Sequence, residues 1–460
     1  MTKPPGSTRR GVLQSGAAVA IGFPAIVPSS VFGATAPSNR INIGAIGVGR
    51  ISRIHDMVEI FKNDDARIIA VCDLDTRRVK QGIELVDKSY GDKAGKPYSG
   101  TRGYADHHEL LASKDIDAVL VSTPDHQHAP VSIAAVRAGK HVYCQKPASL
   151  TIVEGRKMAD AVAKTDRILQ VGSQQRSQDP WPQFHRACEL VRNGRIGRLT
   201  HVEIGLPGDP SGPEAGPMPI PANLNYDAWL GSTPEAYYTE IRVHPQDGGF
   251  SRPGWLRCEQ FGAGMITGWG AHHVDIAHWG MDTEHSGPVE IWGSAEFPKS
   301  GLWNVHGPFE TYGRYANGVI MKIRGALPNG VKFIGTEGSI FATRTGGGVT
   351  ASDPAIAAAG ESGLVASNPK ILDSVIGPNE VHLYRSPEQH RNWLDSIRSG
   401  KPNVSPAELG HRACSTCLLH WIAMHNPDRH LHWDPVAERF LGDDAANAML
   451  SRPQRAGYAI

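Results

Sequence analysis

"RINIGAIGVGRIS", residues 40–52, is the stretch that decides the fold. Its first half is apolar and has the length of a buried strand, and its second half is a glycine turn that opens a helix. One glycine permits the tight turn and the next lets the backbone approach a pyrophosphate at the helix N-terminus. Ser52 stands where the third glycine of the usual G-x-G-x-x-G pattern would be. The residues expected to contact a dinucleotide here are Gly47, Val48, Gly49, Arg50 and Ile51.

The next apolar strand predicts which dinucleotide is bound. "ARIIAVCDLD", residues 66–75, places Asp73 directly after a strand-like run. A carboxylate at this point suits a ribose 2′-hydroxyl and repels a 2′-phosphate, so NAD is favoured. Arg77 and Arg78 leave NADP open, because either guanidinium could bind that phosphate.

Three further strand-like runs end in polar turns. They are "IDAVLVSTPDHQHAP" (116–130), "HVYCQKPASL" (141–150) and "RILQVGSQQRS" (167–177), with a helical run between the first two. Alternating strands and helices predict a parallel, doubly wound sheet over residues 40–176, whose strand ends line one crevice. The polar residues expected in that crevice are Thr123, Pro124, His128, Gln145 and Lys146.

Residues 177–460 are expected to form a second domain that binds substrate and mediates oligomers. Alternating runs between 194 and 344 predict a large open sheet that is mainly antiparallel, so the whole chain is assigned to the α/β class. Residues 346–381 are rich in Gly, Ala, Ser and Pro and are interpreted as a surface insertion. Residues 386–460 are expected to return toward the first domain, beginning with a helix.

Composition excludes several classes of function. A net charge of +1 with 20% charged residues gives no field that would favour nucleic acid or an anionic membrane. The six cysteines lie far apart except Cys414 and Cys417, which are expected to be buried thiols within a helix. The histidine-rich run "AHHVDIAHW", residues 271–279, lacks the spacing of a zinc motif, and we expect no metal.

The N-terminus has the pattern of a targeting segment. Arg9 and Arg10 precede a short apolar run from Ala17 to Val27, which two prolines interrupt. The run is too short for a membrane span, and residues 1–36 resemble a twin-arginine signal, which exports proteins already folded. We therefore expect passage through the twin-arginine machinery to the periplasm or the exterior, with no insertion into the membrane.

The glycine turn, the "STPxxxH" turn (122–128) and the "KP" pair (146–147) resemble the Gfo/Idh/MocA oxidoreductases. The resemblance runs from about residue 40 to 460 and implies a Rossmann domain, an open-sheet domain and homo-oligomers. In the family motif "EKP" the lysine lies beside the nicotinamide and binds or deprotonates the substrate hydroxyl, a role that would fall on Lys146. Gln145 occupies the position of the family's glutamate, so one negative charge is missing.

"GWGAHHVD", residues 268–275, matches the family pattern D-x-G-x-H-x-x-D. The resemblance makes His272 the catalytic histidine and Asp275 the following aspartate. Gly268 replaces the first aspartate, so proton removal would rest on Lys146 and His272. Four residues in polar or aromatic surroundings are further candidates for substrate binding: Arg176, Tyr238, Trp255 and His273.

An exported enzyme meets no free pool of NAD, so the expected function is oxidation of a sugar or glycoside hydroxyl with a cofactor retained through the cycle. A first alternative is redox-neutral glycoside cleavage, in which transient oxidation acidifies a C–H and allows elimination. A second is a carbohydrate-binding protein without turnover, which the lost carboxyl groups at 145 and 268 would favour.

Overall fold

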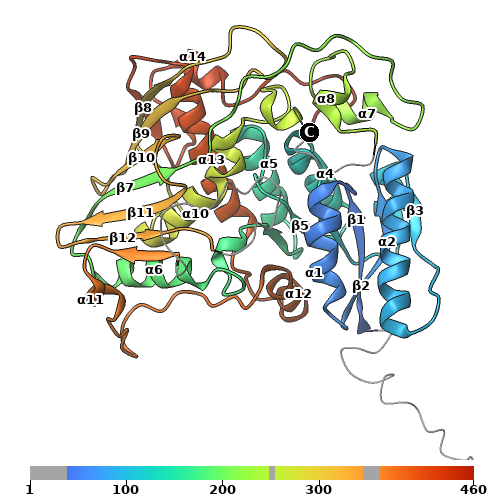
Figure 1. Cartoon of the computed structure of the whole chain (residues 1–460), viewed down its shortest axis with the longest axis horizontal. Helices are drawn as coiled ribbons and strands as arrows, with labels where there is room; N and C mark the ends of the chain where they lie inside the picture. Colours follow the sequence, from blue (N-terminus) through green and yellow to red (C-terminus); the bar gives the residue numbers. More distant parts are fainter. Residues whose placement is uncertain (1–38, 248–253, 346–362) are drawn as a thin grey trace, which may run out of the picture. The chain divides into compact units, whose positions relative to one another are not determined.

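The computed structural model describes residues 39–247, 254–345 and 363–460. The predicted signal segment, 1–36, and residues 346–362 of the predicted surface insertion lie outside the described residues. From Ile41 onward the chain forms one compact unit that contains two sheets (Figure 1).

The first sheet is the predicted dinucleotide-binding sheet. Its strands are all parallel in the order β3-β2-β1-β4-β5-β6. The bounds are β1 Ile41–Ile46, β2 Ala66–Cys72, β3 Arg102–Tyr104, β4 Ala118–Val121, β5 His141–Cys144 and β6 Leu169–Val171. Because β1 pairs with both β2 and β4, the strand order reverses beside it, and ligands bind at such a switch point.

Helices cover both faces of this sheet. One face packs against α1 Met57–Phe61, α2 Thr76–Ala94 and α12 Gln389–Ser399, and the other against α3 His107–Ala112, α4 Asp125–Arg137 and α5 Ile152–Ala163. A π-helical turn, η3 Ser52–Asp56, leads into α1. Local sequence sets the ends of α2, since the Asp75 carboxylate accepts from Arg77 N and Gly95 is left-handed.

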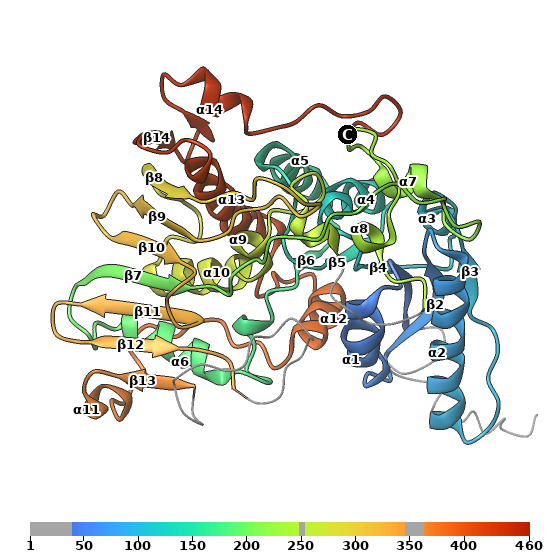
Figure 2. The same cartoon turned by 45° about the horizontal axis from the view of Figure 1, so that its top comes forward.

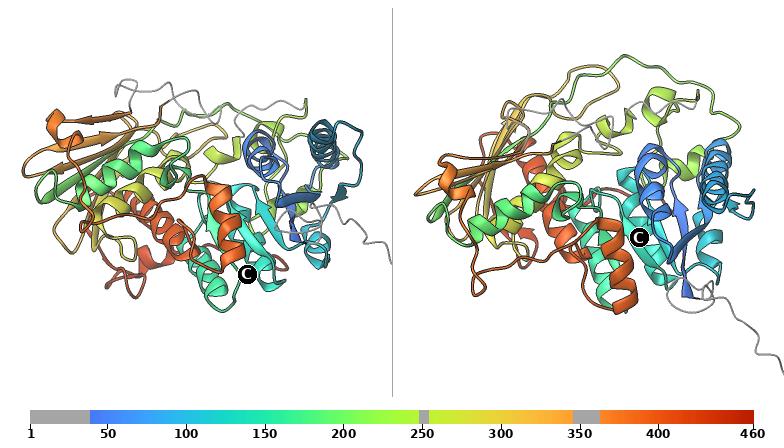
Figure 3. Two further views of the ribbon diagram at one scale, coloured as in Figure 1. Left: turned by 90° about the horizontal axis from the view of Figure 1, so that it is seen from below. Right: turned by 60° about the horizontal axis from the view of Figure 1, so that its bottom comes forward.

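Helix α12 comes from the far end of the chain, as expected for a return segment. Its Trp393 and Leu394 are fully buried in the core of the first sheet, and it contacts α1 and β5 (Figure 3). The first domain is therefore completed by residues more than 200 positions away in the sequence.

The second sheet has the order β13-β12-β11-β7-β10-β9-β8-β14-β15 (Figure 2). The bounds are β7 Leu199–Gly205, β8 Glu290–Ala295, β9 Phe309–Arg314, β10 Ile320–Arg324, β11 Gly330–Gly335, β12 Ser339–Ala342, β13 Leu364–Ala366, β14 Leu431–Asp434 and β15 Arg439–Phe440. Within the described chain, β7 and β10 are the parallel pair and the other neighbours are antiparallel, which confirms a mainly antiparallel sheet.

One end of the predicted surface insertion belongs to this sheet. Within residues 363–381, β13 pairs with β12 at the sheet edge and α11 Pro369–Leu372 follows it. This strand, Leu364–Ala366, has only three residues, too few for a periodic pattern to show in the sequence.

A helical layer covers one face of the second sheet: α6 Pro182–Arg192, α10 Gly270–Met281 and α13 Ala407–Met424. Every residue of α10 is buried, because α6 and α13 flank it. Cys414 and Cys417 are buried free thiols of α13, as predicted. Short elements complete the chain: η4 Gln174–Arg176, α7 Tyr226–Leu230, α8 Glu240–Val243, η5 Gly254–Arg257, α9 Met265–Gly268 and α14 Asp444–Ala448. Across the described ranges, the helices fall short of the length and apolarity that a bilayer crossing requires.

Candidate active site

The glycine turn after β1 requires glycine at its first position. Gly47 has φ +85°, and a Cβ there would lie 2.7 Å from the carbonyl of Ser122, which follows β4. Val48 N donates to the Asp73 carboxylate at 2.8 Å, and Asp75 N donates to its other oxygen at 2.9 Å. The turn and the carboxylate at the end of β2 are therefore fixed together, as a ribose-binding acid requires.

A cavity of about 680 Å³ begins at this turn and extends to α10. Its size and its polar strand ends fit a dinucleotide with a small substrate. Of the residues predicted to bind cofactor or to act in catalysis, these line it: Gly47, Gly49, Arg50, Ile51, Asp73, Thr123, Pro124, His128, Gln145, Lys146 and His272. Val48 is buried behind the turn, and its backbone N–H serves to hold Asp73.

Two arginines could meet the cofactor phosphates at this end. Arg78 lines the cavity, and a Cβ at Gly49 would lie 3.5 Å from its Nη1, so the guanidinium lies over the glycine turn. Arg77 points elsewhere, because its guanidinium bonds to Gln246 and Asp75. Arg50 also lines the cavity, so Arg50 and Arg78 are the cations placed for a pyrophosphate.

Lys146 joins the two parts of the cavity. It follows β5, and its Nζ donates to the carbonyl oxygen of Gly268, the last residue of α9, at 2.9 Å. His272 lies in the first turn of α10 and lines the same cavity. Residues from separate domains thus converge at one end of the cavity, which we call the reacting end.

His272 is neutral near pH 7. Burial holds its pKa well below the usual value, and the positive charges of Arg344 and Lys146 lower the pKa further. Its Nδ1 is buried and makes no hydrogen bond within the described part of the chain. A neutral imidazole with an unused nitrogen can exchange a proton with a bound ligand.

Asp125 is a carboxyl group that the sequence reasoning missed. It is the first residue of α4, lines the cavity and is 3% exposed. Burial raises its pKa to about 7, while Lys146 counteracts the rise. Its Oδ2 is buried and has no hydrogen-bond donor among the described residues. Its position between two predicted cofactor residues, Pro124 and His128, was the available signal.

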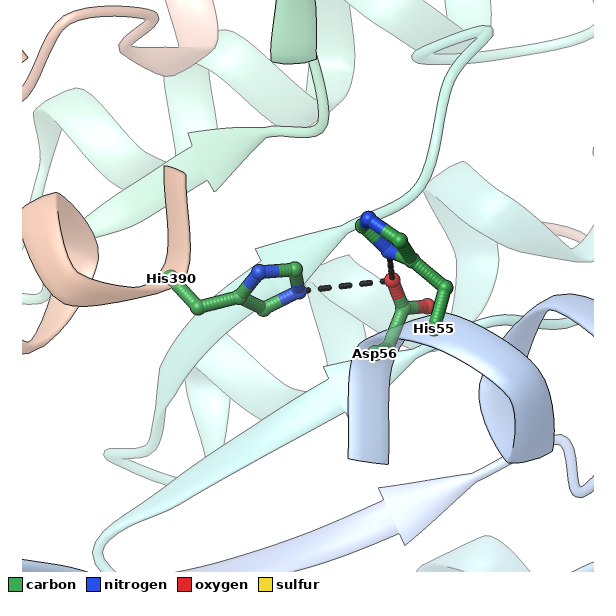
Figure 4. A group of neighbouring side chains, drawn as sticks. All are labelled: His55, Asp56 and His390. Carbon is green, nitrogen blue, oxygen red and sulfur yellow. Dashed lines mark hydrogen bonds and ion pairs between the residues drawn. The ribbon is translucent and has the colours of Figure 1, made fainter. Parts of the chain in front are cut away.

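Gln145 belongs to a second buried cluster, which supplies a negative charge nearby. Its Nε2 donates to Asp56 Oδ1 at 2.7 Å, and Ser122 Oγ donates to Asp56 Oδ2 at 2.7 Å. His55 and His390 lie 3.1 and 3.3 Å from the same carboxylate (Figure 4). A glutamate at 145 would face this carboxylate directly, so the neutral amide fits the site.

His390 carries a positive charge within this cluster. Burial alone would lower its pKa, but Glu388 at 2.9 Å and Asp56 raise the pKa to about 10. For Asp56, burial acts to raise the pKa, and the two histidines more than offset it, so the pKa lies well below the usual value. His390 is thus a buried cation that two carboxylates, Asp56 and Glu388, share.

His128 positions the loops around Lys146. Its Nδ1 lies 2.6 Å from Pro147 O and its Nε2 lies 2.9 Å from Thr123 O. Burial lowers its pKa to about 4, so the ring is neutral and donates to one of the two carbonyls. It ties the turn after β4 to the turn after β5.

Of the four candidate substrate residues, Trp255 lines the cavity. The cavity lining, within the described residues, leaves out Arg176, Tyr238 and His273. Arg176 is corrected to a structural role, because its guanidinium forms a bidentate pair with Asp275 and also bonds Glu284. The other two are also buried among packing partners, since Tyr238 packs edge-on against Tyr226 and His273 lies 3.2 Å from Asn329.

Residues 223–246, which we call the strap, lie against the ribose end of the cavity. Asn225 N donates to Leu74 O at 2.9 Å, and Thr76 N donates to Asn223 O at 2.9 Å. His244 Nε2 lies 2.9 Å from the buried Asp75 carboxylate. The strap residues that line the cavity are Asn225, Ala228, Trp229, Val243 and His244.

A Rossmann sheet joined to an open-sheet domain, with lysine and histidine converging on a dinucleotide-sized cavity, defines an NAD-binding oxidoreductase fold. The chain belongs to the Gfo/Idh/MocA family. The family model "Oxidoreductase family, NAD-binding Rossmann fold" matches residues 41–173, and the model "Oxidoreductase family, C-terminal alpha/beta domain" matches 212–343 and 372–460.

Curated relatives include a myo-inositol 2-dehydrogenase of Thermotoga maritima, 36% identical over 174 residues, which are 38% of this chain and 47% of that protein. A glycosyl hydrolase family 109 protein of Stenotrophomonas maltophilia is 29% identical over 210 residues, 44% of this chain and 42% of that protein. The matched part thus spans less than half of either relative.

Solved structures share the fold over most of the chain. The WlbA dehydrogenase of Bordetella pertussis, crystallised with NADH and UDP-GlcNAcA, has a TM-score of 0.57 at 16% identity, covering 86% of this chain and 99% of its own. The aldose-aldose oxidoreductase of Caulobacter crescentus has a TM-score of 0.56 at 18% identity, covering 85% of this chain and 99% of its own.

Proposed function

We propose that this protein is an exported oxidoreductase that oxidises a hydroxyl of a sugar or glycoside and keeps its NAD bound through the cycle. The observation that carries the proposal is the meeting of Lys146, Asp125 and His272 at one end of the dinucleotide-sized cavity. Export is inferred from the twin-arginine pattern at Arg9 and Arg10.

A nicotinamide held in this cavity by the glycine turn and Asp73 would supply the acceptor for a hydride from a carbinol carbon. The chain's own groups handle the proton. Lys146 Nζ is held by Gly268 O and faces the cavity, where it can bind the substrate hydroxyl and take up the hydroxyl proton as it passes one of its own protons to the Asp125 carboxylate. Asp125 lies close enough to Lys146 for their charges to interact, and its raised pKa suits it to take up that proton near neutral pH. His272, which is neutral, could accept a proton from a substrate C–H. Once protonated, it could donate that proton to a leaving group.

Asp125 would thereby supply the carboxyl group that is missing at positions 145 and 268. The family's carboxylates are absent from those two positions, but an acid from α4 borders the same cavity. This favours an active enzyme over a binding protein without turnover.

Retention of the cofactor is supported by the strap. The strap is fixed to the Asp73–Thr76 turn by four hydrogen bonds or ion pairs that involve Leu74, Asp75 and Thr76, and Tyr458 near the C-terminus also lines the cavity. A bound dinucleotide would leave only after these contacts open. Replacing His244 and Asn223 by alanine should therefore speed nucleotide release, measured by the fluorescence of bound NADH after dilution.

The redox-neutral cleavage of a glycoside remains the second candidate. Similarity to a glycosyl hydrolase family 109 protein favours it, and His272 could serve as the C–H base. The test uses the purified mature protein with candidate sugars and aryl glycosides, following the near-ultraviolet absorbance of reduced nicotinamide. Reduction that persists until a second sugar is added supports net oxidation, whereas aglycone release without net reduction supports cleavage.

Lys146→Ala is the variant that tests the shared mechanism. Loss of the group that binds and deprotonates the hydroxyl should lower turnover by roughly 10³-fold or more, while nucleotide stays bound because the glycine turn and Asp73 are untouched. Undiminished turnover in this variant would remove the lysine from the mechanism.

We also propose that the protein forms a homo-oligomer through the open face of the second sheet. The stacked rings of Trp292, Tyr312 and His430 lie partly exposed on that sheet. Light scattering of the mature protein gives the mass directly, and a monomer at micromolar concentration would reject the oligomer.

A further inference from the structure

Arg344 lies at the reacting end of the cavity, two residues after the end of β12, and no sequence pattern indicated it. Its backbone is held on both sides by the start of α6. Gln183 Nε2 donates to Thr343 O at 2.8 Å, and Trp181 Nε1 donates to Thr345 O at 3.0 Å. The second sheet therefore presents this arginine to the cavity from a fixed position.

Gln175 joins Arg344 to the helix that carries His272. The Gln175 side chain is buried, with its amide oxygen 3.0 Å from Arg344 Nε and its amide nitrogen 3.2 Å from His272 O. The amide accepts from the arginine and donates to the helix carbonyl. The next residue, Arg176, pairs with Asp275 further along the same helix. The turn η4 thus holds α10 at two points, and Arg344 is bonded to the first of them.

Trp269 forms a second link between Arg344 and His272. The central carbon of the guanidinium lies 4.6 Å from the ring centre of Trp269, and its other face lies 4.0 Å from that of Trp181. The Trp269 ring in turn meets the His272 ring edge-on, with 6.0 Å between ring centres. Because His272 Nδ1 has no hydrogen bond among the described residues, packing against this indole helps to set the direction of the imidazole.

Arg344 also acts on the charge state of His272. The charged or titratable groups that face this imidazole come from four places: Arg344 after β12, Lys146 after β5, His273 beside it on α10, and His55 on η3. Burial is the main cause of the lowered pKa of His272, and Arg344 contributes most among these four groups. A neutral imidazole is the form that accepts a proton.

We propose that Arg344 is a positioning residue, which acts through Gln175 and Trp269 to fix the first turn of α10 and to keep His272 ready to accept a proton. The arginine does this through contacts that are already made in the structure, without binding substrate itself. This inference rests on the proposed function, because it explains how the histidine assigned to that function is held.

Three substitutions separate the position of His272 from its charge state. Arg344→Met removes both the positive charge and the bond to Gln175. Arg344→Lys keeps the charge but loses the planar group that stacks on the indoles and the Nε donor. Gln175→Met removes the bridge and leaves Arg344 in place. The values of kcat and KM are measured from about pH 5 to 9, with NAD-loaded protein and a sugar that reduces the bound nucleotide.

All three substitutions should lower kcat by roughly 10- to 100-fold, the effect of a displaced reactive group, and leave KM nearly unchanged. Arg344→Met alone should also move the acid limb of the kcat profile to higher pH, by roughly one pH unit, because His272 loses a neighbouring positive charge. A raised KM with unchanged kcat would overturn the proposal, since Arg344 would then bind substrate. An acid limb that stays in place in Arg344→Met would overturn it as well.

Arg314→Met is the matched control, because Arg314 also lies over a tryptophan, Trp292, but outside the cavity lining. It should leave kcat, KM and the acid limb as they are in wild type. A change equal to that of Arg344→Met would show that loss of any such arginine has the same general effect, and would reject the specific role of Arg344.

A chemical label tests the same role without turnover. Diethyl pyrocarbonate reacts with the neutral imidazole, and mass spectrometry of the labelled peptide measures the reaction at His272. The pH of half-maximal labelling should be higher in Arg344→Met than in wild type or Arg344→Lys. That shift, without nucleotide reduction by any sugar, would support the role of Arg344 and reject the oxidoreductase proposal. Reduction by a sugar, with labelling and kinetics of Arg344→Met equal to wild type, would reject the positioning role and leave the oxidoreductase proposal standing.

Discussion

Asp56 and Asp125 are both buried near the end of β5, yet their surroundings shift their pKa values in opposite directions. Asp56 accepts hydrogen bonds from Gln145 and Ser122 and lies beside two histidines, and its pKa is lowered. Asp125 has an oxygen without a donor in the described chain, and burial raises its pKa to about 7. Burial is nearly the same in the two cases, so the number of partners decides the charge state.

The contrast separates a structural cluster from a reactive one. Gln145 and Lys146 are neighbours in the chain, but Gln145 completes the ion network around Asp56, whereas Lys146 faces the cavity with Asp125. Around Asp56, each carboxylate oxygen has a donor or a cation beside it, and such a network stabilises the fold. A buried acid without full hydrogen bonding, such as Asp125, lowers the stability of the fold. Groups of this kind are concentrated at active sites.

His390→Phe should give the largest effect on stability. Phenylalanine keeps the stacking on Tyr143, whose ring lies 4.3 Å away, but leaves Asp56 and Glu388 buried without their shared cation. We expect a loss of about 3–5 kcal/mol in the free energy of unfolding, the usual cost of breaking a buried ion pair. Chemical denaturation at pH 7 measures it.

The pH dependence of the stability difference between wild type and His390→Phe shows whether the charge of His390 causes the loss. The pKa of His390 is raised to about 10, above the unfolded value of about 6.5, so its contribution is full below about pH 6.5 and is lost as pH rises through about 10. The wild-type advantage over His390→Phe should shrink over that window. An advantage that stays constant to pH 10 would mean that packing, not charge, is responsible.

Asp125→Asn should lower activity and raise stability. Loss of the proton acceptor beside Lys146 should reduce turnover by about 100-fold, measured by nucleotide reduction in single turnover. The folded pKa of about 7 lies above the unfolded value, so wild type pays an ionisation cost that grows between about pH 4 and 7 and then levels off. The variant should therefore gain up to about 2 kcal/mol relative to wild type at pH 8, and almost nothing at pH 4.

Equal stability of Asp125→Asn and wild type at both pH values would show that Asp125 is solvated and not strained. Unchanged turnover would remove the acid from the mechanism. Asp56→Asn is the same substitution at the other buried acid. Whereas Asp125→Asn should raise stability, Asp56→Asn should lower it at pH 7, because it removes the negative charge that pairs with His390.

Gln145→Glu should give the smallest effect. It restores the family's glutamate but places a second carboxylate at the 2.7 Å contact with Asp56. We expect a loss of about 1 kcal/mol at pH 7 from this repulsion, measured by denaturation. In a double-mutant cycle, Asp56→Asn should relieve the loss. Additive effects of the two substitutions would show that the amide and the carboxylate are not coupled.

Local sequence patterns predicted most strands of both sheets and a part of the cavity lining, chiefly the glycine turn, Asp73 and the turns after β4 and β5. Glycine at 47 and the carboxylate at 73 follow from backbone geometry within one strand–turn–helix unit, so they could be found without the fold. Arg176 was misread because a polar residue at a strand end can face the cavity or pair internally, and only packing against α10 shows that it pairs with Asp275.

The sequence by itself determined the Rossmann unit, the second domain and the positions of Lys146 and His272, because each depends on short-range periodicity or on a local motif. Only the tertiary structure decided which buried acid is ionised, that Gln145 is matched to Asp56, and that Arg344 borders the reacting end. Those properties depend on charges brought together from distant parts of the chain, such as Asp56 and His390 at 3.3 Å, and electrostatic energy follows distance in space, not separation in sequence.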